Sequence, residues 1–327
     1  MALRERTNST GNAILSWMKE AIAPKRATST PRRRHESQEK NIEWSIDISE
    51  IAEEAQINFA ELGAFGSDKC FDHPDFDNDI TTYCFAHQAT CEDSSFTWEK
   101  LGGESTYKST ALFVNSIYRS RAFPREVLHL AIHYIQAVIK ADPGFSKSNL
   151  EDLGVAAVHL AAKLERQIGF RLEFLESYNV RNVFKMERMI CHAMNFSLWP
   201  TTIPIFMRLL HSQACDDSWQ WEVAKCLTDF MTCDLELSLL SPALAAGVAI
   251  RLVNMISRTD LWNPNCYAII QHDEKEYKIP HEQLCRLLLA ILDRPKAYDP
   301  VSNQHAAILQ KIIHPKKKFL EQEAGIF

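Results

Sequence analysis

Two Cys-x-x-His pairs in the N-terminal third of the chain have residue types that could bind a metal ion. They are Cys70 with His73 and Cys84 with His87, and Cys91 follows shortly after the second pair. Zinc takes thiolate and imidazole ligands in a tetrahedral arrangement. However, Cys-x-x-His is not a standard zinc-knuckle spacing, and five candidate ligands exceed the four that such a site holds. We therefore predict no metal site and interpret these residues as buried cysteines and surface histidines.

No other pattern in the sequence predicts catalysis. The chain has no glycine-rich phosphate loop, no Gly-x-Ser-x-Gly elbow and no His-Glu-x-x-His motif. Its histidines are scattered, and His133 falls within a segment, 126–139, that we predict to be a buried helix. A histidine there is better explained as a hydrogen-bonded core residue than as a general base. We therefore expect a binding protein that needs no cofactor and is not itself an enzyme.

The composition favours a helical globular protein. Apolar residues make up 46% of the 327 residues and charged residues 24%, but there are only 10 glycines. Sandwiches and barrels need more glycine turns than this. The net charge of −6 argues against a general nucleic-acid binder. We also expect no membrane span and no secretory signal, and the odd number of nine cysteines indicates reduced thiols in the cytosol or nucleus.

Two segments rich in small residues are expected to form the axes of two helical units. They are residues 150–165 and 241–256, where glycine and several alanines let neighbouring helices approach closely. They lie about 90 residues apart, which leaves room for a five-helix unit around each. Residues 126–139 are apolar around most of the helix circumference and must be packed on all sides, whereas 182–198 are amphipathic. Pro200 ends the first series, because proline cannot continue a helix.

Three segments of the first unit, in this order, resemble the cyclin family. EVLHLAIHYI (126–135) is similar to the family's "tLhLAvnYi" helix. GVAAVHLAAKLE (154–165) is similar to the helix that carries the family's hallmark lysine, which falls on Lys163. KMERMICHAMNFSLWPTTIPIFMRLL (185–210) is similar to "mE..iL..L.F.l..PTp..Fl..fl", with the hallmark glutamate at Glu187.

The second unit resembles the family more loosely, through DFMTCD (229–234) and SPALAAGVA (241–249). The resemblance spans roughly residues 100–295 and implies an all-α fold of two tandem five-helix cyclin boxes. The predicted domains are a disordered basic tail (1–42), a poorly defined N-terminal extension (43–96), a first cyclin box (97–199), a second cyclin box (200–295) and a C-terminal helix with a basic tail (296–327).

The resemblance also implies a binding site for a cyclin-dependent protein kinase. In this family the hallmark lysine and glutamate lie on adjacent helices and hold the main chain of the kinase's C-helix and activation segment. Lys163 and Glu187 would take these roles, with Leu164, Phe196 and Leu198 as the apolar surface around them. Charged hydrogen bonds of this kind gain strength where an interface excludes water. The competing interpretation is that both charges are ordinary solvated residues.

Several features depart from the family pattern. Arg166 replaces the second acid after the hallmark lysine, and the segment between Lys163 and Glu187 is shorter than usual. The patch that docks Arg-x-Leu motifs is not recognisable near Tyr107, so we expect no docking of that kind. The N-terminal tail has neither the Arg-x-x-Leu nor the Lys-Glu-Asn destruction signal of mitotic cyclins. These differences indicate a divergent branch, of which cyclins specialised for meiotic recombination are one example.

The two tails carry short motifs for modification and nuclear import. Thr30 precedes a proline and two arginines, the form that cyclin-dependent kinases prefer, although an unused site is an equal alternative. Lys25–Arg26 with 32–34, and 315–318, resemble nuclear import signals, so we expect a nuclear protein. The rival functional hypothesis is a cyclin-fold scaffold, for example at meiotic crossover sites, or a transcription-factor module that engages no kinase.

Overall fold

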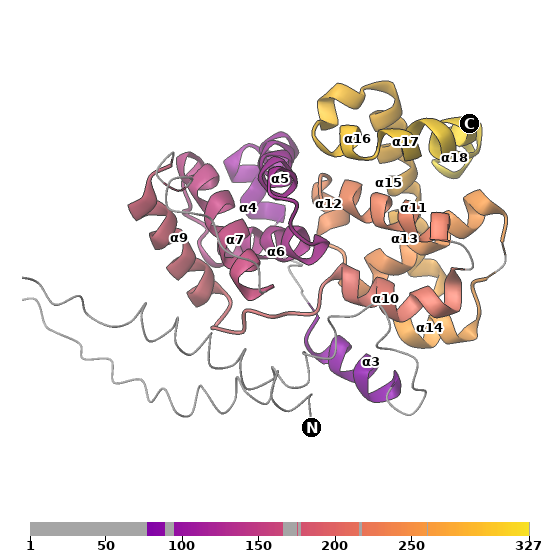
Figure 1. Cartoon of the computed structure of the whole chain (residues 1–327), viewed down its shortest axis with the longest axis horizontal. Helices are drawn as coiled ribbons and strands as arrows, with labels where there is room; N and C mark the ends of the chain where they lie inside the picture. The colour runs from indigo at the N-terminus through magenta and orange to yellow at the C-terminus, as the bar shows by residue number, and fades with distance from the viewer. Residues whose placement is uncertain are drawn as a thin grey trace, which may run out of the picture. The chain divides into compact units, whose positions relative to one another are not determined.

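The computed structural model describes residues 77–88, 95–165, 175, 178–215, 218–259 and 261–326. The predicted basic tail and most of the N-terminal extension, including Thr30, Cys70, His73 and Cys91, lie outside these residues. Within the described residues every regular element is helical (Figure 1), and the β-type pairing is limited to an isolated bridge between residues 88 and 201. The predicted all-α class is confirmed.

The first group of helices is built around α7 (Leu150–Leu164), as its small residues predict. The helices α5 (Gly103–Ser120), α6 (Arg125–Ala141) and α9 (Val180–Ala193) all pack against α7, and α4 (Ser95–Leu101) packs on α5. The buried stretch of α7 runs almost without interruption from Leu150 to Ala162. In α6 most residues are buried, which confirms that this helix is packed on all sides.

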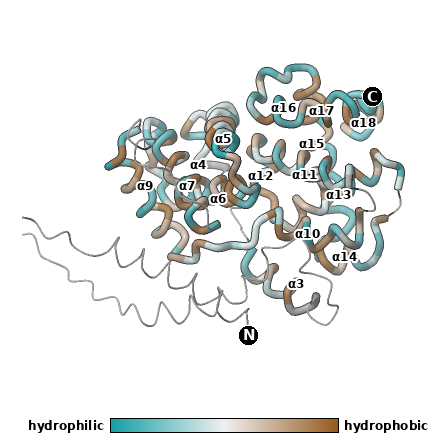
Figure 2. The backbone as a smooth tube through the Cα atoms, in the orientation of Figure 1, coloured by the Kyte–Doolittle hydropathy of each residue, from teal (hydrophilic) through white to brown (hydrophobic). Residues whose placement is uncertain are grey.

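Helix α9 is amphipathic, as predicted, but it ends earlier than expected. Its buried residues are Val183, Met186 and Ile190, and its tube alternates between hydrophobic and hydrophilic colours (Figure 2). The prediction extended this helix to residue 198, whereas the structure ends it at Ala193. Asn195 and the residue after it adopt left-handed backbone conformations, which an α-helix of L-residues does not continue through.

The second group of helices surrounds α13 (Pro242–Ser257), the other predicted axis. Helices α10 (Ile203–Ala214), α11 (Ser218–Met231), α14 (Pro264–Ile270) and α15 (Glu274–Asp293) pack on it, and the short α12 (Leu235–Ser238) contacts α15. Gly247 of α13 is required by a close approach, because a Cβ atom there would lie 2.6 Å from the Tyr277 hydroxyl of α15. Helix α3 (Asp77–Ala86) packs on α10.

The C-terminal segment differs from the predicted helix with a basic tail. It continues as short helical turns, and Lys316–Lys318 lie where a 3-10 turn gives way to α18 (Lys317–Glu323). Leu320 and Ala324 are fully buried, and α18 packs against α15. The prediction of a basic tail rested on the lysines and did not take the apolar residues after them into account. The remaining turns are η2 (Lys147–Asn149), η3 (Pro295–Tyr298), α16 (Val301–Gln304), α17 (Ala306–Ile308), η4 (Leu309–Ile313) and η5 (His314–Lys316).

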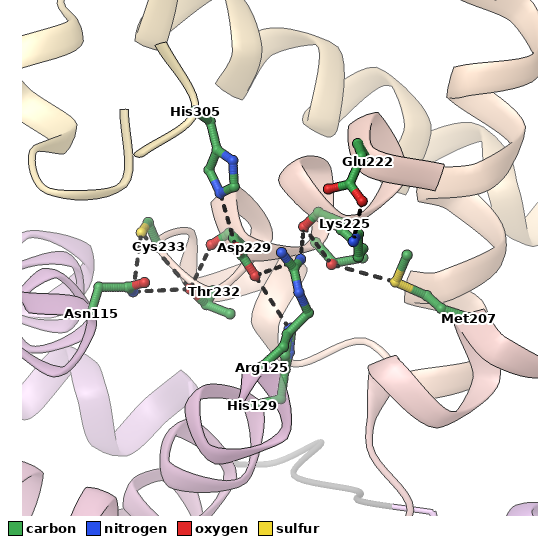
Figure 3. A network of polar contacts seen from close by, with 11 residues as sticks. Asn115, Arg125, His129, Met207, Glu222, Lys225, Asp229, Thr232, Cys233 and His305 are labelled. Atoms are coloured by element: carbon green, nitrogen blue, oxygen red, sulfur yellow. Dashed lines mark hydrogen bonds and ion pairs between the residues drawn. The ribbon is translucent and has the colours of Figure 1, made fainter. Parts of the chain in front are cut away.

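A buried carboxylate on α11 joins the two groups of helices (Figure 3). Asp229 is fully buried, and Nη1 of Arg125, at the start of α6, lies 2.9 Å from its Oδ1. His305, from the C-terminal segment, places Nε2 2.9 Å from Oδ2, and His129 places Nε2 3.7 Å from Oδ1. Arg125 also donates to the backbone oxygen of Lys225. One side chain therefore connects α6, α11 and the C-terminal segment.

The charge of Asp229 is held by these neighbours. Burial alone raises the pKa of its carboxyl group. The nearby guanidinium of Arg125, the close approach of His129 and the hydrogen bond with His305 outweigh burial, so the pKa lies well below its usual range. Asp229 is therefore ionised at neutral pH although no part of it meets solvent.

A second line of hydrogen bonds crosses between the same two groups. The Tyr107 hydroxyl donates to the backbone oxygen of Thr232 over 2.8 Å, and the Asn115 amide donates to the Thr232 hydroxyl over 3.3 Å. The Gln136 amide donates to the Ser238 hydroxyl over 2.8 Å. All three donors lie on α5 or α6, so the position of the first group against the second is fixed at several points.

Replacing Asp229 by asparagine should lower the free energy of unfolding at pH 7 by about 3 to 5 kcal/mol, because Arg125 then keeps a largely buried charge without its partner. Urea denaturation followed by circular dichroism measures this. Since the folded pKa is depressed, the stabilisation is present above the unfolded value of 3.8 and is lost as the pH falls below it. Wild type and Asp229→Asn should therefore converge in acid.

The matched control for this prediction is Glu274→Gln, which breaks the exposed ion pair between Arg251 and Glu274. Exposed pairs contribute roughly 1 kcal/mol or less, so the control should change stability little. An Asp229→Asn protein that is as stable as the control at pH 7 would contradict the structural role given to Asp229.

Candidate functional site

The structure brings together the two charged residues that the sequence singled out. Lys163 lies in the last turn of α7, Glu187 lies in the middle of α9, and Nζ of the lysine is 2.8 Å from Oε1 of the glutamate. Ala161 and Ala162, just before the lysine, are fully buried and leave room for close packing between α7 and α9. The side chains of the pair are 17% and 14% exposed, so the contact sits at the protein surface but is well shielded from water.

His159 is a third member of this cluster that sequence reasoning missed. It lies one turn before Lys163 on α7, and its Nδ1 is 2.9 Å from the same Oε1 of Glu187. The signal was available, since residues four apart share a helix face. Within the described residues both contacts to Glu187 fall on Oε1, which leaves Oε2 to accept a hydrogen bond from a partner.

The electrostatics of the cluster keep the glutamate charged. Burial raises the pKa of Glu187, but the hydrogen bond from His159 and the positive charge of Lys163 lower it by more. The net effect is a pKa below the ordinary value for glutamate. The site therefore presents an ammonium and a carboxylate that are both charged at neutral pH and are already held in place by each other.

The predicted apolar residues take different positions around this pair. Leu164 and Leu198 are half-buried and pack against the core of the first group of helices. Phe196 is 66% exposed. It follows the end of α9 at Ala193, and its amide donates to the Cys191 backbone oxygen over 2.8 Å. Exposure of a large aromatic side chain in this way is typical of a contact surface.

The backbone at Phe196 holds the ring outward. Its φ is 61°, in the left-handed region that a bulky side chain adopts rarely. The ring meets His192 edge-on, with centroids 5.5 Å apart. The turn that follows α9 therefore places an exposed aromatic ring just beyond the C-terminal end of the helix that carries Glu187.

Of the cysteines and histidines that resembled metal ligands, the two in the described residues, Cys84 and His87, have other surroundings. Cys84 is fully buried, and burial raises the pKa of its thiol to about 11. His87 contacts the backbone oxygen of Tyr83 instead. Among the residues that the structure describes, no three His, Cys, Asp or Glu side chains gather as a metal site. Their candidate partners Cys70, His73 and Cys91 lie outside the described residues.

His133 is buried on α6, and burial lowers its pKa to about 4, so it is neutral at physiological pH as a core residue should be. None of the helices in the described part of the chain is both long and apolar enough to cross a membrane.

Comparison with known proteins shows which family this part of the chain resembles. A family model described as "Cyclin, N-terminal domain" matches residues 87–199, which contain α4 to α9 and both Lys163 and Glu187. The chain therefore carries a divergent cyclin N-terminal domain. Its fold is similar to that of a viral cyclin from herpesvirus saimiri, with a TM-score of 0.54 at 12% identity over 65% of this chain and 96% of that chain. The predicted helical cyclin-box fold is confirmed, whereas the predicted domain boundaries stay predictions.

The curated relatives match only part of the chain. It is 26% identical to "G2/mitotic-specific cyclin-A" of Drosophila melanogaster over 174 residues, 49% of this chain and 34% of that protein. It is 28% identical to "Cyclin-A2" of Gallus gallus over 150 residues, 43% of this chain and 38% of that protein. The match thus spans less than half the length of these relatives.

Replacing His159 by leucine should raise the pKa of Glu187, because burial remains while one hydrogen bond to the carboxylate is lost. A pH titration of glutamate carboxyl carbons by NMR measures this. The control is His192→Leu, which removes an exposed histidine of α9 that contacts Phe196. If the carboxyl of Glu187 titrates identically in the His159→Leu protein and the wild type, His159 does not stabilise the carboxylate.

Proposed function

We propose that this protein is the regulatory subunit of a cyclin-dependent protein kinase. The kinase would bind a face made of Lys163, Leu164, Glu187, Phe196 and Leu198. The observation that carries the proposal is the 2.8 Å contact between Lys163 and Glu187, inside the segment that matches the cyclin N-terminal domain. Proteins of this family are regulatory subunits and not enzymes.

The charged pair suits recognition of a partner's main chain. The ammonium of Lys163 can donate to a backbone carbonyl, and Oε2 of Glu187 can accept from a backbone N–H. Because the pair is held together before binding, little side-chain freedom is lost when a partner arrives. A partner helix that covers the site also excludes water, which strengthens both charged hydrogen bonds.

The apolar residues supply the other half of the surface. Phe196 exposes much of its ring, and the partly buried Leu164 and Leu198 support the helices next to it. An exposed aromatic ring near a shielded charge pair resembles the anchors that dominate protein interfaces. A kinase helix held on this face would be biased toward its active position, since kinase activation depends on where that helix lies.

Lys163→Glu should reduce the recovery of kinases in affinity purification of the full chain by at least about tenfold, because a charged bond in the interface becomes repulsive. The double variant Lys163→Glu with Glu187→Lys restores the pair within the chain but exchanges the charges that a kinase would meet. It should therefore recover thermal stability without recovering kinase binding. Quantitative mass spectrometry of bound kinases and a melting curve measure the two effects separately.

A matched control exchanges the charges of Asp293 and Lys317, a pair of the same 2.8 Å length between α15 and α18. This variant should bind kinases as the wild type does. Unchanged kinase recovery with Lys163→Glu, or a wild-type protein that recovers no kinase, would favour the rival function of a cyclin-fold scaffold, including one at meiotic crossover sites.

We propose further that the protein acts in the nucleus, on the strength of its basic clusters. Residues 316–318 lie in a helical turn that packs by Leu320, so the N-terminal cluster at 32–34 is the better candidate for an import signal. Alanine substitution at 32–34 in a fluorescent fusion of the full chain should move it out of the nucleus, whereas substitution at 316–318 should not. A fusion that is cytoplasmic before any substitution would contradict this proposal.

A further inference from the structure

An open groove lies at the beginning of α9, next to the proposed kinase-binding face. Its volume is about 240 Å³, and it is lined by Asn179, Arg181, Asn182, Lys185 and Arg188. The three cations are exposed and stand four and three residues apart, so they share one face of the helix. The groove therefore has a strongly positive wall built from a single helix.

These three cations have no acidic partner in the described part of the chain. Other cations of that part form ion pairs, such as Arg208 with Glu126, and Lys163 is paired with Glu187. The carboxylate of Asp152 contacts Asn182 and not the cations. Like charges at this spacing weaken a helix. Because no acid of the described residues compensates these three cations, an anion from outside the chain is a suitable partner for them.

The end of the helix adds to this preference for an anion. Asn179 is the N-cap of α9, and its side chain accepts a hydrogen bond from the Asn182 backbone N–H over 3.2 Å. The first turn of a helix carries a partial positive charge, which adds to the field of Arg181 and Lys185. The groove, the unpaired cations and the helix dipole all favour the same sign of ligand.

The size of the site identifies the class of anion. From Arg181 to Arg188 the helix rises by about 10 Å, which suits one phosphate group and its neighbours. A nucleic acid would need a longer row of cations, and the net charge of −6 opposes a polyanion. Phe184 lies on the same face between Arg181 and Arg188 and is 43% exposed. An apolar ring beside a phosphate site suits a side chain of a peptide.

We propose that this groove binds a phosphorylated serine or threonine in an extended segment of a partner protein. The phosphate would lie among Arg181, Lys185 and Arg188, and a neighbouring side chain would rest on Phe184. Arginine guanidinium groups form paired hydrogen bonds with phosphate oxygens, which a single carboxylate matches less well. The site adjoins Glu187 along α9, so one partner can contact both surfaces, but the proposal does not depend on kinase binding.

The test uses the full chain and three immobilised peptide libraries with randomised flanks, whose central residue is phosphothreonine, threonine or glutamate. The phosphothreonine library should retain the protein at least tenfold better than either of the others. Raising the salt concentration should weaken retention, because exposed charges are screened. The triple variant Arg181→Gln, Lys185→Gln, Arg188→Gln should lose retention on the phosphorylated library, roughly tenfold for each charged contact removed.

The control is Lys275→Gln with Lys278→Gln, which removes two exposed cations from α15 and should leave retention unchanged. A melting curve checks that the triple variant folds, and Lys185→Gln alone should weaken retention if it does not. Equal retention on the threonine and phosphothreonine libraries would overturn the proposal, as would a triple variant that binds like the wild type. Stronger binding to a twelve-nucleotide single-stranded DNA would assign the groove to nucleic acid instead.

Discussion

The buried carboxylate of Asp229 is the constraint on which the arrangement of the two groups of helices depends. A charge without solvent is tolerated only because Arg125 and two histidines surround it. Arg125 begins α6, so the contact fixes where α6 starts against α11, and α6 in turn packs on α7 and α9. Through this chain of contacts, an interaction far from Lys163 and Glu187 determines the position of the helices that carry them.

The candidate site also contains a carboxylate held by neighbouring positive groups, but this one, Glu187, lies at the protein surface. Asp229 is completely enclosed, and Arg125 and His305 each lie 2.9 Å from one of its two oxygens, so it is suited to hold structure. Glu187 is 14% exposed, and the contacts described for it use one oxygen. The first arrangement leaves nothing for a ligand, whereas the second leaves an acceptor that is fixed, charged and reachable. Whether both oxygens of a carboxylate already have a partner within the chain distinguishes a structural ion pair from one that can recognise another protein.

Much of the fold could be predicted from sequence, because helix periodicity is local. The apolar circumference of α6 and the small residues of α7 and α13 indicated buried helices, and these helices are buried. Lys163 and Glu187 were found by resemblance. Asp229 and Arg125 could not be paired by such reasoning, since their contact joins distant parts of the chain. His159 and the packing of the C-terminal segment were missed because their partners, Glu187 and α15, are fixed only by tertiary packing.

The charges of α9 show how one helix can carry two kinds of recognition. On one face Glu187 meets Lys163 and His159, so positive groups of the chain itself compensate its charge. On the neighbouring face Arg181, Lys185 and Arg188 stand together beside a groove, and no described acid compensates them. The helix stays folded because its apolar residues, such as Met186, are buried in the core. Most of the stability of a helix in a protein comes from tertiary packing. The residues on the exposed face of α9 are therefore free to serve binding.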